Sequence, residues 1–395
     1  MLAFLQTNTP IVIFNQIVVT LLTVCFLYQV VFFVIGALRG EVAPPKAKKL
    51  HRYAFFIAAH NEEAVIANLV RSIKDQDYPS ELIEVFVVAD ACTDNTAQFA
   101  REAGAIVYER NDLARKGKSW VMDFGFDRIL NEYPDTFEGY FIFDADNVIS
   151  RDYVSKMNDA FDQGFHVVTS YRNFGSSWIS AANATWYLRE ARFLNNARNI
   201  CKTSCAVSGS GYLISASVIE GMHGWQFHTL TEDIQFTTFC AIHGIRIGYA
   251  PAEFFDEQPV TFKASWKQRM RWTKGFYQVF FTYGKHLVKS TFRYHRFAAY
   301  DMFMTIAPGM LLSLISMLAN ATVGGLSHGF LATEVEMQAC AASLIMTFAM
   351  MYQTFFILAL LTTIFEYKHI HCAQKWRLVT NLFTFPIFMF SYIPI

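Results

Sequence analysis

The stretch YAFFIAAHNEE, residues 53–63, decides the fold of this 395-residue chain. Its first seven residues form a short apolar run typical of a buried strand, and polar residues follow at once. The same pattern recurs further on, with runs of strand type at 85–89, 105–108, 140–143 and 166–170. We therefore expect a series of buried strands, several of which end in a polar segment.

Helical stretches separate the predicted strands. We expect them at about 62–75, 95–103, 119–130 and 152–162. Strands that alternate with helices of this length form βαβ units around a parallel sheet, so the sequence predicts an α/β domain. In such sheets ligands bind beyond the carboxyl ends of the strands. The residues directly after each strand are therefore the candidates for a binding site.

Carboxylates gather at three of these strand ends. Glu62 follows the first strand, Asp90 follows the second, and Asp144 and Asp146 follow the strand at 140–143. Acids placed so close together repel one another unless some are protonated or a cation binds. Because carboxylate oxygens suit Mg²⁺ or Mn²⁺, the pattern predicts a divalent-cation site at this rim.

Some of the polar residues have a simpler explanation. Asp94 and Asn95 are good N-caps for the helix that follows them. That explanation does not suit Asp144 and Asp146, which flank a single residue at a strand end. The segment SGSG at 208–211 has two interpretations, a plain turn or a loop of small residues that lets the backbone approach a ligand closely.

Two further segments begin helices with charged residues. The segment RKGK at 115–118 opens one helix, and a helix N-terminus is a favourable place for a phosphate. The segment TLTED at 229–233 opens another, with Thr231 as its cap. Asp233 then lies in the first turn and points toward whatever lies opposite.

A basic and aromatic stretch follows the predicted α/β domain. Nine Lys and Arg residues lie between 263 and 296, and no acid occurs from 258 through 300. This composition predicts basic amphipathic helices at a membrane surface. Gln268, Arg271 and Trp272 are spaced so that they share one helical face.

Charged side chains are almost absent from three long apolar stretches, at 11–38, 297–323 and 341–365, which together contain only Asp301. A helix of about 20 apolar residues spans a bilayer, so each stretch is long enough, with a buried helix of a soluble protein as the alternative. A fourth stretch at 378–395 is a span, a re-entrant piece, or a span cut short by the end of the sequence.

The composition excludes several classes of protein. Lys and Arg total 33 and so do Asp and Glu, which gives a net charge of zero and argues against a nucleic-acid partner. Charged residues make up 17% of the chain, against about 25% in a typical soluble protein, and hydrophobic residues 53%. The seven scattered cysteines include no CxxC pair, which suits a reducing compartment and argues against a zinc ribbon.

The distribution of basic residues predicts the orientation in the membrane. Arg39 and several lysines follow the first apolar stretch, whereas residues 1–10 contain no Lys or Arg. The positive-inside rule then places the N-terminus outside and residues 39–296 in the cytoplasm. The loop at 324–340 has no basic residue and falls outside, while the loop at 366–377 has three and falls inside. We expect a multi-pass protein of the cell membrane.

Seven motifs occur along the chain in an order that indicates a single protein family. They are AHNEE (59–63), VADACTDNT (88–96), RKGK (115–118), DAD (144–146), SGSG (208–211), TED (231–233) and QRMRW (268–272). Together they resemble the membrane-embedded family 2 glycosyltransferases, the group that includes cellulose, chitin and hyaluronan synthases. The resemblance covers about residues 53–285, extends to the flanking apolar stretches, and is specific because all seven motifs recur together.

The resemblance implies a fold and a division of the chain. The fold is a GT-A domain, a Rossmann-like nucleotide-sugar domain inserted between transmembrane helices. Residues 1–38 would be an N-terminal transmembrane helix and 39–258 the cytosolic GT-A domain. Residues 259–296 would be interfacial helices with the QxxRW motif, and 297–395 a C-terminal transmembrane region.

The resemblance also implies roles for individual residues. The uridine end of a UDP-sugar would be held by His60, Asn61, Glu62 and Asp90, with Lys116 near the nucleotide. Asp144 would contact the nucleotide or ribose side, and Asp144 and Asp146 would hold Mg²⁺ or Mn²⁺ on the diphosphate. Asp233 would be the general base, and Glu232 and Arg271 are grouped with it as catalytic. Gln268 and Trp272 would close over the donor and the acceptor.

The implied activity is an inverting, metal-dependent transfer of a sugar from a UDP-sugar to a growing exopolysaccharide or cell-wall glycan. A lipid acceptor is the alternative, and the small number of spans favours it, whereas QRMRW favours polymer synthesis. A non-catalytic membrane partner is a third reading, which the intact Asp146, Asp233 and Arg271 oppose. The sequence does not indicate the donor sugar, the linkage, processivity or the oligomeric state.

Two features depart from the family pattern. Ala58 and Ala59 stand where many relatives have proline and another small residue, and we expect little consequence. The sequence ends within an apolar run at 392–395, where relatives continue through a basic segment, so we expect a fragment or an early stop.

Overall fold

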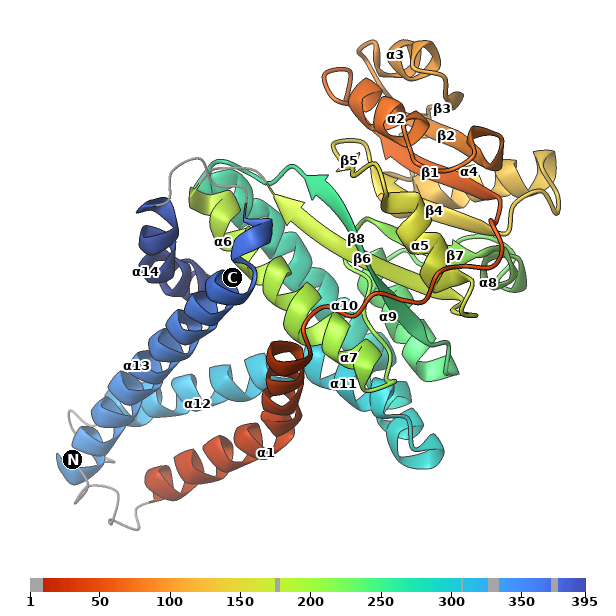
Figure 1. The fold of residues 1–395 in the computed structure, drawn as a ribbon. Helices are drawn as coiled ribbons and strands as arrows, with labels where there is room; N and C mark the ends of the chain where they lie inside the picture. Colours follow the sequence, from red (N-terminus) through yellow and green to blue (C-terminus); the bar gives the residue numbers. More distant parts are fainter. Residues whose placement is uncertain (1–9, 175–177, 307, 326–333, 371–375) are drawn as a thin grey trace.

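The computed structural model describes the chain except for residues 1–9, 175–177, 307, 326–333 and 371–375. The segments 1–9 and 326–333 entered the topology prediction, as did Lys375, and they lie outside the described residues. The described part consists of an α/β domain with a group of long apolar helices beside it (Figure 1).

The α/β domain is built on one sheet of eight described strands in the order β3-β2-β1-β4-β7-β6-β8-β5. Their bounds are β1 Tyr53–Ala59, β2 Ile83–Asp90, β3 Ile106–Arg110, β4 Gly139–Asp144, β5 Val148–Ile149, β6 Val167–Phe174, β7 Tyr212–Ser215 and β8 Ile247–Asp256. All five predicted strands are present, and β1 to β4 are parallel as predicted.

The sheet as a whole is mixed, because the five predicted strands run in the same direction and two strands that were not predicted, β5 and β7, run the other way. Strand β7 runs antiparallel to both of its neighbours, β4 and β6, and β5 runs antiparallel to β8. Strands β6 and β8 are parallel to each other. The direction of β7 depends on how the long helical connection after β6 returns to the sheet, and no local sequence pattern determines that path.

Helices cover both faces of the sheet, which gives three layers. On one face lie α2 (Ile66–Lys74), α3 (Thr96–Glu102) and α5 (Tyr153–Phe161). On the other face lie α4 (Lys118–Glu132), α8 (Ala216–Gly221) and α9 (Glu232–His243). A short 3₁₀ turn, Ser80–Leu82, precedes β2.

Strand β1 shows how the alternation of side chains supplies both cores. Phe55 stacks on Phe141 of β4, with ring centroids 4.5 Å apart, on the face covered by α5. Phe56 points to the opposite face and stacks on Phe126 of α4 at 5.1 Å. Burying each of these rings contributes about 1.5–3 kcal/mol, so the central strands are held firmly in place.

The register of the central strands brings their polar ends to one edge. Ala58 of β1 lies opposite Asp144 of β4, and Ala59 lies opposite Ala89 of β2. His60, Asp90 and Asp144 therefore end or follow adjacent strands at the same level, as predicted.

A long helical run connects β6 to β7. It consists of α6 (Trp178–Arg189), a π-helical segment (Glu190–Asn195) and α7 (Asn196–Ile200). Helix α6 packs against the apolar helices α13 and α14, and the π-helical segment packs against α1. This run therefore joins the α/β domain to the apolar helices.

The basic stretch after β8 forms one helix rather than several. Helix α10 extends over Phe262–Tyr294, and the Thr261 hydroxyl caps it by accepting a hydrogen bond from the Ala264 N–H at 3.3 Å. It packs against α9 on one side and α11 on the other.

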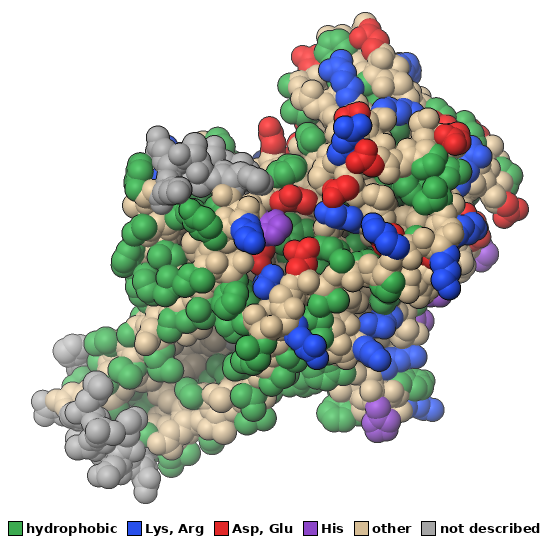
Figure 2. Space-filling view, in the orientation of Figure 1, with side chains coloured by type: hydrophobic (Ala, Val, Ile, Leu, Met, Phe, Trp, Pro, Cys, Tyr) green, Lys and Arg blue, Asp and Glu red, His purple; other side chains and the backbone are tan. Residues whose placement is uncertain are grey.

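Within the part of the chain that the structure describes, three helical stretches are long and apolar enough to cross a membrane, at 10–39, 297–323 and 337–365. They contain α1 (Pro10–Arg39), α11 (Phe297–Ile306) with α12 (Pro308–Gly325), and α13 (Glu334–Phe365). Figure 2 shows a surface dominated by apolar side chains over these helices, whereas Lys, Arg, Asp and Glu gather over the α/β domain.

The fourth apolar stretch forms a shorter helix, α14 (Trp376–Phe390), which contains Pro386. A 3₁₀ turn at Tyr367–His369 lies between α13 and α14. Phe385 and Phe388 of α14 are buried beside Ala182 of α6 and Ala359 of α13. Within the described residues α14 thus packs against the junction of the two parts of the molecule and is not among the helices long enough to span.

The contact between α10 and α9 leads to a prediction about Gly275. A Cβ atom at this position would lie 2.5 Å from Thr231 Oγ1 and 2.9 Å from the Thr231 backbone nitrogen. Gly275→Ala should therefore push α10 away from the start of α9, at a cost of about 1–3 kcal/mol that offsets the helical preference of alanine. Thermal unfolding measures this effect.

The matched control is Gly284→Ala in the same helix. There the nearest heavy atom to a new Cβ is Phe280 Cδ2 at 3.5 Å, an ordinary contact. We expect this variant to be at least as stable as the wild type. Equal stability of the two variants would contradict the close approach at Thr231.

Candidate active site

One cavity of about 1320 Å³ extends from the polar edge of the sheet to the apolar helices. It contains nearly every residue that the sequence analysis selected. The predicted residues that line the cavity are His60, Glu62, Asp90, Lys116, Asp144, Asp146, Glu232, Asp233, Gln268, Arg271 and Trp272. Asn61 is not part of the described lining; its side-chain oxygen accepts a hydrogen bond from the Thr93 N–H at 2.8 Å.

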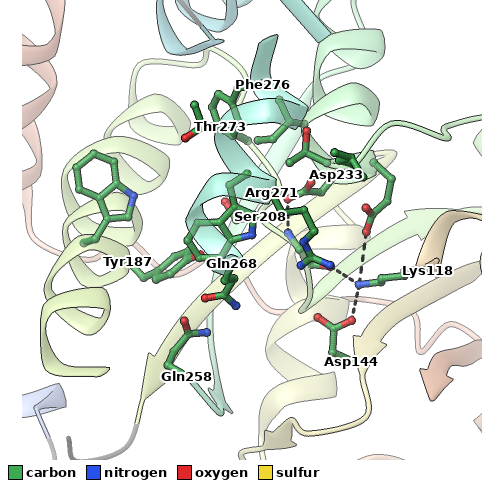
Figure 3. A pocket seen from close by; sticks show the side chains of 18 of the residues that line it. Lys118, Asp144, Tyr187, Ser208, Asp233, Gln258, Gln268, Arg271, Thr273 and Phe276 are labelled. Atoms are coloured by element: carbon green, nitrogen blue, oxygen red, sulfur yellow. Dashed lines mark hydrogen bonds and ion pairs between the residues drawn. The ribbon is translucent and has the colours of Figure 1, made fainter. Parts of the chain in front are cut away.

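Lys118 lies at the centre of the polar part of the cavity. Its ammonium group is 2.6 Å from Asp144 Oδ1 and 3.8 Å from Glu232 Oε1, and it donates to the Gly209 carbonyl at 2.6 Å. Burial opposes the positive charge, but Asp144 and Glu232 outweigh this effect and raise the pKa of Lys118. Figure 3 shows Lys118 beside Asp144, with Arg271 and Asp233 directed toward the same space.

Lys116 of the RKGK segment was predicted to be a residue of the binding site, and Lys118 was not. Lys116 lines the cavity but is exposed, and it makes no ion pair with any described residue. Helix α4 begins at Lys118, after Gly117 with φ +110°. The RKGK motif indicated that a lysine lies in the site. The residue at which α4 begins decides which of the two lysines points into the cavity.

A second group of acids surrounds the DAD motif. The Asn147 amide bridges two of them, donating to Asp146 Oδ1 at 3.1 Å and to Asp256 Oδ1 at 2.6 Å. Arg172 lies 3.3 Å from Asp256 Oδ2. Burial, with the charges of Asp256, Asp144 and Glu62, raises the pKa of Asp146 to about 8, which shows how strongly this arrangement disfavours another negative charge.

Arg172 and Asp256 were not selected from the sequence. Both belong to strand ends, because Arg172 lies near the end of β6 and Asp256 is the last residue of β8. The apolar run before Asp256 resembles the run before Asp144, and both patterns indicate a buried strand that ends in an acid. The antiparallel β7, which lies between β4 and β6 and so connects β6 and β8 to the rest of the sheet, was not predicted. The two residues could therefore not be placed at this edge.

The acids of the DAD group fit a hard divalent cation. Asp144 and Asp146 supply carboxylate oxygens, the ligands that Mg²⁺ and Mn²⁺ prefer, and a cation would relieve the repulsion that raises the pKa of Asp146. Within the described residues, no group of three His, Cys, Asp or Glu side chains has the geometry of a complete metal site.

The TED motif opens α9, and its two acids face the cavity. The Gly209 N–H donates to Asp233 Oδ2 at 2.6 Å, so the SGSG loop holds this carboxylate. Gly209 has φ +71°, a conformation that favours glycine. The SGSG loop thus orients an acid, and its Ser208 and Gly209 also line the cavity. Burial raises the pKa of Asp233, and it raises the pKa of Glu232 to about 7.

The edge formed by β1 and β2 contains a buried ion pair. Arg110 Nη1 lies 2.5 Å from Asp90 Oδ1, and the Arg110 side chain is almost fully buried. The His60 ring Nδ1 is 2.6 Å from the Asp90 carbonyl oxygen. Asp90 is thus held at the cavity wall by Arg110, the last residue of β3, which was not predicted from the sequence.

The QRMRW segment presents two different faces of α10. Gln268, Arg271 and Trp272 line the cavity, as their spacing predicted. Arg269 is fully buried on another face, with its guanidinium 4.3 Å from the Phe388 ring centroid and 4.8 Å from that of Tyr392. This contact attaches α10 to the segment that follows α14.

Comparison with known proteins identifies relatives of this chain. A family model described as "Glycosyltransferase like family 2" matches residues 51–275. The beta-monoglucosyldiacylglycerol synthase of Synechocystis sp. is 26% identical over 234 residues, which cover 58% of this chain and 48% of that protein. The poly-beta-1,6-N-acetyl-D-glucosamine synthase of Staphylococcus aureus is 24% identical over 243 residues, 58% of this chain and 56% of that protein.

The chain thus spans about half the length of the curated relatives it matches. Among solved structures, the mannosyltransferase PcManGT from Pyrobaculum calidifontis, in complex with GDP-Man and Mn²⁺, superposes with a TM-score of 0.59. That match has 17% identity and covers 96% of this chain and 99% of the other, which shows a shared fold. Because the family model matches more than half of the 395 residues, the chain belongs to the family 2 glycosyltransferases, and its α/β domain has the GT-A fold.

Proposed function

We propose that this protein transfers a sugar from a UDP-sugar to an acceptor hydroxyl, with inversion at the anomeric carbon and with Mg²⁺ or Mn²⁺ as cofactor. The observation that carries the proposal is the single cavity in which the DAD acids, the TED acids and the QRMRW face meet. A donor and an acceptor need to be held side by side for such a transfer.

The donor would lie along the edge formed by β1, β2 and β4. The carboxylate of Asp90, held in place by Arg110, is suited to accept a hydrogen bond from the ring N–H of uracil. His60, Asn61 and Glu62 would complete the nucleotide end, with Lys116 at the mouth of the cavity. GDP-Man in the PcManGT complex makes GDP-sugars the necessary comparison.

The leaving diphosphate would lie among cations. Asp144 and Asp146 would hold the divalent metal, which neutralises charge on the diphosphate when bound. Arg271 and Lys118 face the same space and would stabilise the charge that develops as the C1–oxygen bond breaks. Gln268 and Trp272 would position the sugar from α10.

Asp233 would act as the general base. Its carboxylate is held by the Gly209 N–H and faces the cavity from the first turn of α9. It would take the proton of the acceptor hydroxyl while the hydroxyl oxygen forms a bond to C1 and UDP departs with the electrons of the broken bond. Glu232 would assist by pairing with Lys118. A single displacement of this kind converts an α-linked donor into a β-glycoside.

Two acceptor classes fit this chemistry, a growing exopolysaccharide or cell-wall glycan and a membrane lipid. The poly-N-acetylglucosamine synthase relative supports the first, and the glucosyldiacylglycerol synthase relative supports the second. The lining of the cavity between the apolar helices favours the lipid, because Leu314, Met317, Met351 and Phe355 offer no hydrogen bonds to a glycan.

The proposed arrangement in the membrane follows from the basic residues after α1. Arg39 and the lysines at 46, 48 and 49 would place the GT-A domain in the cytoplasm and the N-terminus outside. The interfacial segment 259–296 would then lie along the inner surface, with α11 to α13 crossing the bilayer.

The experiment that tests the proposal incubates the purified protein with a panel of UDP- and GDP-sugars and with Mg²⁺, Mn²⁺ or EDTA. We expect release of UDP from one UDP-sugar, dependent on a lipid or glycan acceptor and abolished by EDTA. The absence of nucleoside diphosphate release from every donor would contradict the proposed function.

A further inference from the structure

The cavity continues from the proposed catalytic rim into the group of apolar helices. Its far end is lined by Phe26 of α1, Leu314 and Met317 of α12, and Met351 and Phe355 of α13. These side chains offer apolar surface to an occupant, which suits hydrocarbon chains. The Arg189 side chain lines the same cavity, and no ion pair with a described carboxylate is formed by it.

Arg189 is the last residue of α6, where the helix changes from α to π geometry. Its Nη2 donates one long hydrogen bond, 3.4 Å, to Gln29 of α1, and its guanidinium lies 4.7 Å from the Trp186 ring centroid. Among the described residues, no carboxylate oxygen lies within 4.0 Å of it. Burial lowers the pKa of Arg189 to about 10, so its charge is poorly compensated.

Two acids in this region, Asp301 and Glu190, have other partners. Asp301 is taken by Arg198, whose Nε and Nη2 lie 2.7 and 3.0 Å from its two oxygens. Glu190, the next residue in the chain, accepts a hydrogen bond from the Ser208 hydroxyl at 2.8 Å. Ser208 belongs to the SGSG loop at the catalytic rim, so Glu190 faces that end of the cavity.

The other arginines of the cavity already have a partner or a proposed role. Arg172 is close to Asp256, Arg198 is paired with Asp301, and Arg271 is assigned to the donor diphosphate. A partly buried cation beside apolar surface is costly to maintain, and such a residue commonly marks a ligand site. Arg189 is therefore the remaining arginine of the cavity, and it is available to bind an anionic group of a ligand.

We propose that the acceptor is a membrane lipid that carries both a hydroxyl and a phosphate. Arg189 binds the phosphate, the hydrocarbon chains lie between α1, α12 and α13, and the hydroxyl reaches Asp233. This inference rests on the proposed function and specifies its acceptor.

The need for a hydroxyl follows from the chemistry of the base. A phosphate oxygen is already ionised and needs no base to attack C1, whereas a hydroxyl does, and Asp233 is placed to act on one. The hydroxyl proton passes to Asp233, the hydroxyl oxygen bonds to C1, and the diphosphate leaves with the electron pair. The phosphate at Arg189 keeps all its bonds and holds the acceptor in place.

A matched pair of lipids tests the inference on the full wild-type chain in detergent. Dioleoylphosphatidylglycerol carries a hydroxyl and a phosphate, whereas dioleoylglycerol has the same acyl chains and a hydroxyl but no phosphate. We expect a kcat/KM at least about tenfold higher for the phosphate lipid, the effect of one desolvated charge-assisted hydrogen bond. Inorganic phosphate, which lacks the chains, is expected not to inhibit at millimolar concentration.

Substitution of Arg189 supplies the second arm. Arg189→Gln should raise the KM for dioleoylphosphatidylglycerol at least about tenfold and remove the preference over dioleoylglycerol. Arg189→Lys keeps the charge and should keep the preference. The matched control is Arg128→Gln on the exposed face of α4, where Arg128 pairs with Glu132, and it should change neither lipid's KM.

The outcomes separate this inference from the proposed function. Equal use of both lipids by the wild type, an unchanged preference in Arg189→Gln, inhibition by inorganic phosphate, or a polysaccharide product each overturns the inference. In all four cases sugar is still transferred, so the proposed function stands. Failure of the wild type to release UDP from any donor contradicts the proposed function instead. If Arg189→Gln does not fold, the wild-type preference and Arg189→Lys decide the matter.

Discussion

Replacing Asp233 by asparagine is expected to lower the rate of UDP release by roughly 10²–10⁴-fold, the range that a general base contributes. The substituted amide has nearly the same shape, and its oxygen still accepts the Gly209 N–H that holds Asp233 at 2.6 Å. It cannot take a proton from the acceptor hydroxyl. The loss should therefore fall on kcat, with little change in donor affinity, as measured by steady-state kinetics and by binding of UDP.

Two comparison variants make this result specific to Asp233. Glu232→Gln alters the neighbouring acid, which lies 3.8 Å from Lys118, and we expect a smaller loss because it touches the base only indirectly. Asp127→Asn, on the exposed face of α4, should leave kcat unchanged. A loss in Glu232→Gln as large as that in Asp233→Asn would mean that the two acids have been assigned the wrong roles.

Replacing Asp146 by alanine should also abolish measurable transfer, for a different reason. The carboxylate would hold the metal on the donor diphosphate, and loss of several kcal/mol of charge stabilisation corresponds to roughly 10³-fold in rate. Its pKa, raised to about 8 by burial and by Asp256, Asp144 and Glu62, should return to an ordinary range when the cation binds.

The readout for Asp146→Ala is Mn²⁺ binding in the presence of UDP, followed by the electron paramagnetic resonance signal of free Mn²⁺. We expect a clear loss of Mn²⁺ affinity together with the loss of rate. Asp152→Ala, which removes a half-buried acid beside Lys156, serves as the control and should bind Mn²⁺ as the wild type does. Normal Mn²⁺ binding by Asp146→Ala would place the metal elsewhere.

The edge of the sheet could be predicted because it depends on local pattern. A strand such as β1 is recognised from its own seven residues, and the residue after it must lie at the edge. The convergence of His60, Asp90 and Asp144 then follows from the parallel register of three neighbouring strands. The helical spacing of Gln268, Arg271 and Trp272 placed them together in the same way.

The features that could not be predicted depend on contacts between distant segments. Arg172 meets Asp256 because β6 and β8 are neighbours in the sheet, and no motif records that pairing. Lys118, and not the predicted Lys116, lies at the centre of the polar part of the cavity, because α4 begins after Gly117. The charge of Arg189 becomes informative only once α1 and α6 are seen side by side.

The central claim is a single displacement at the anomeric carbon, with Asp233 as base and no enzyme-bound sugar. The most direct test determines by proton NMR the anomeric configuration of the first product formed from an α-linked UDP-sugar. The account predicts a β-glycoside. A product that retains the α configuration would contradict it.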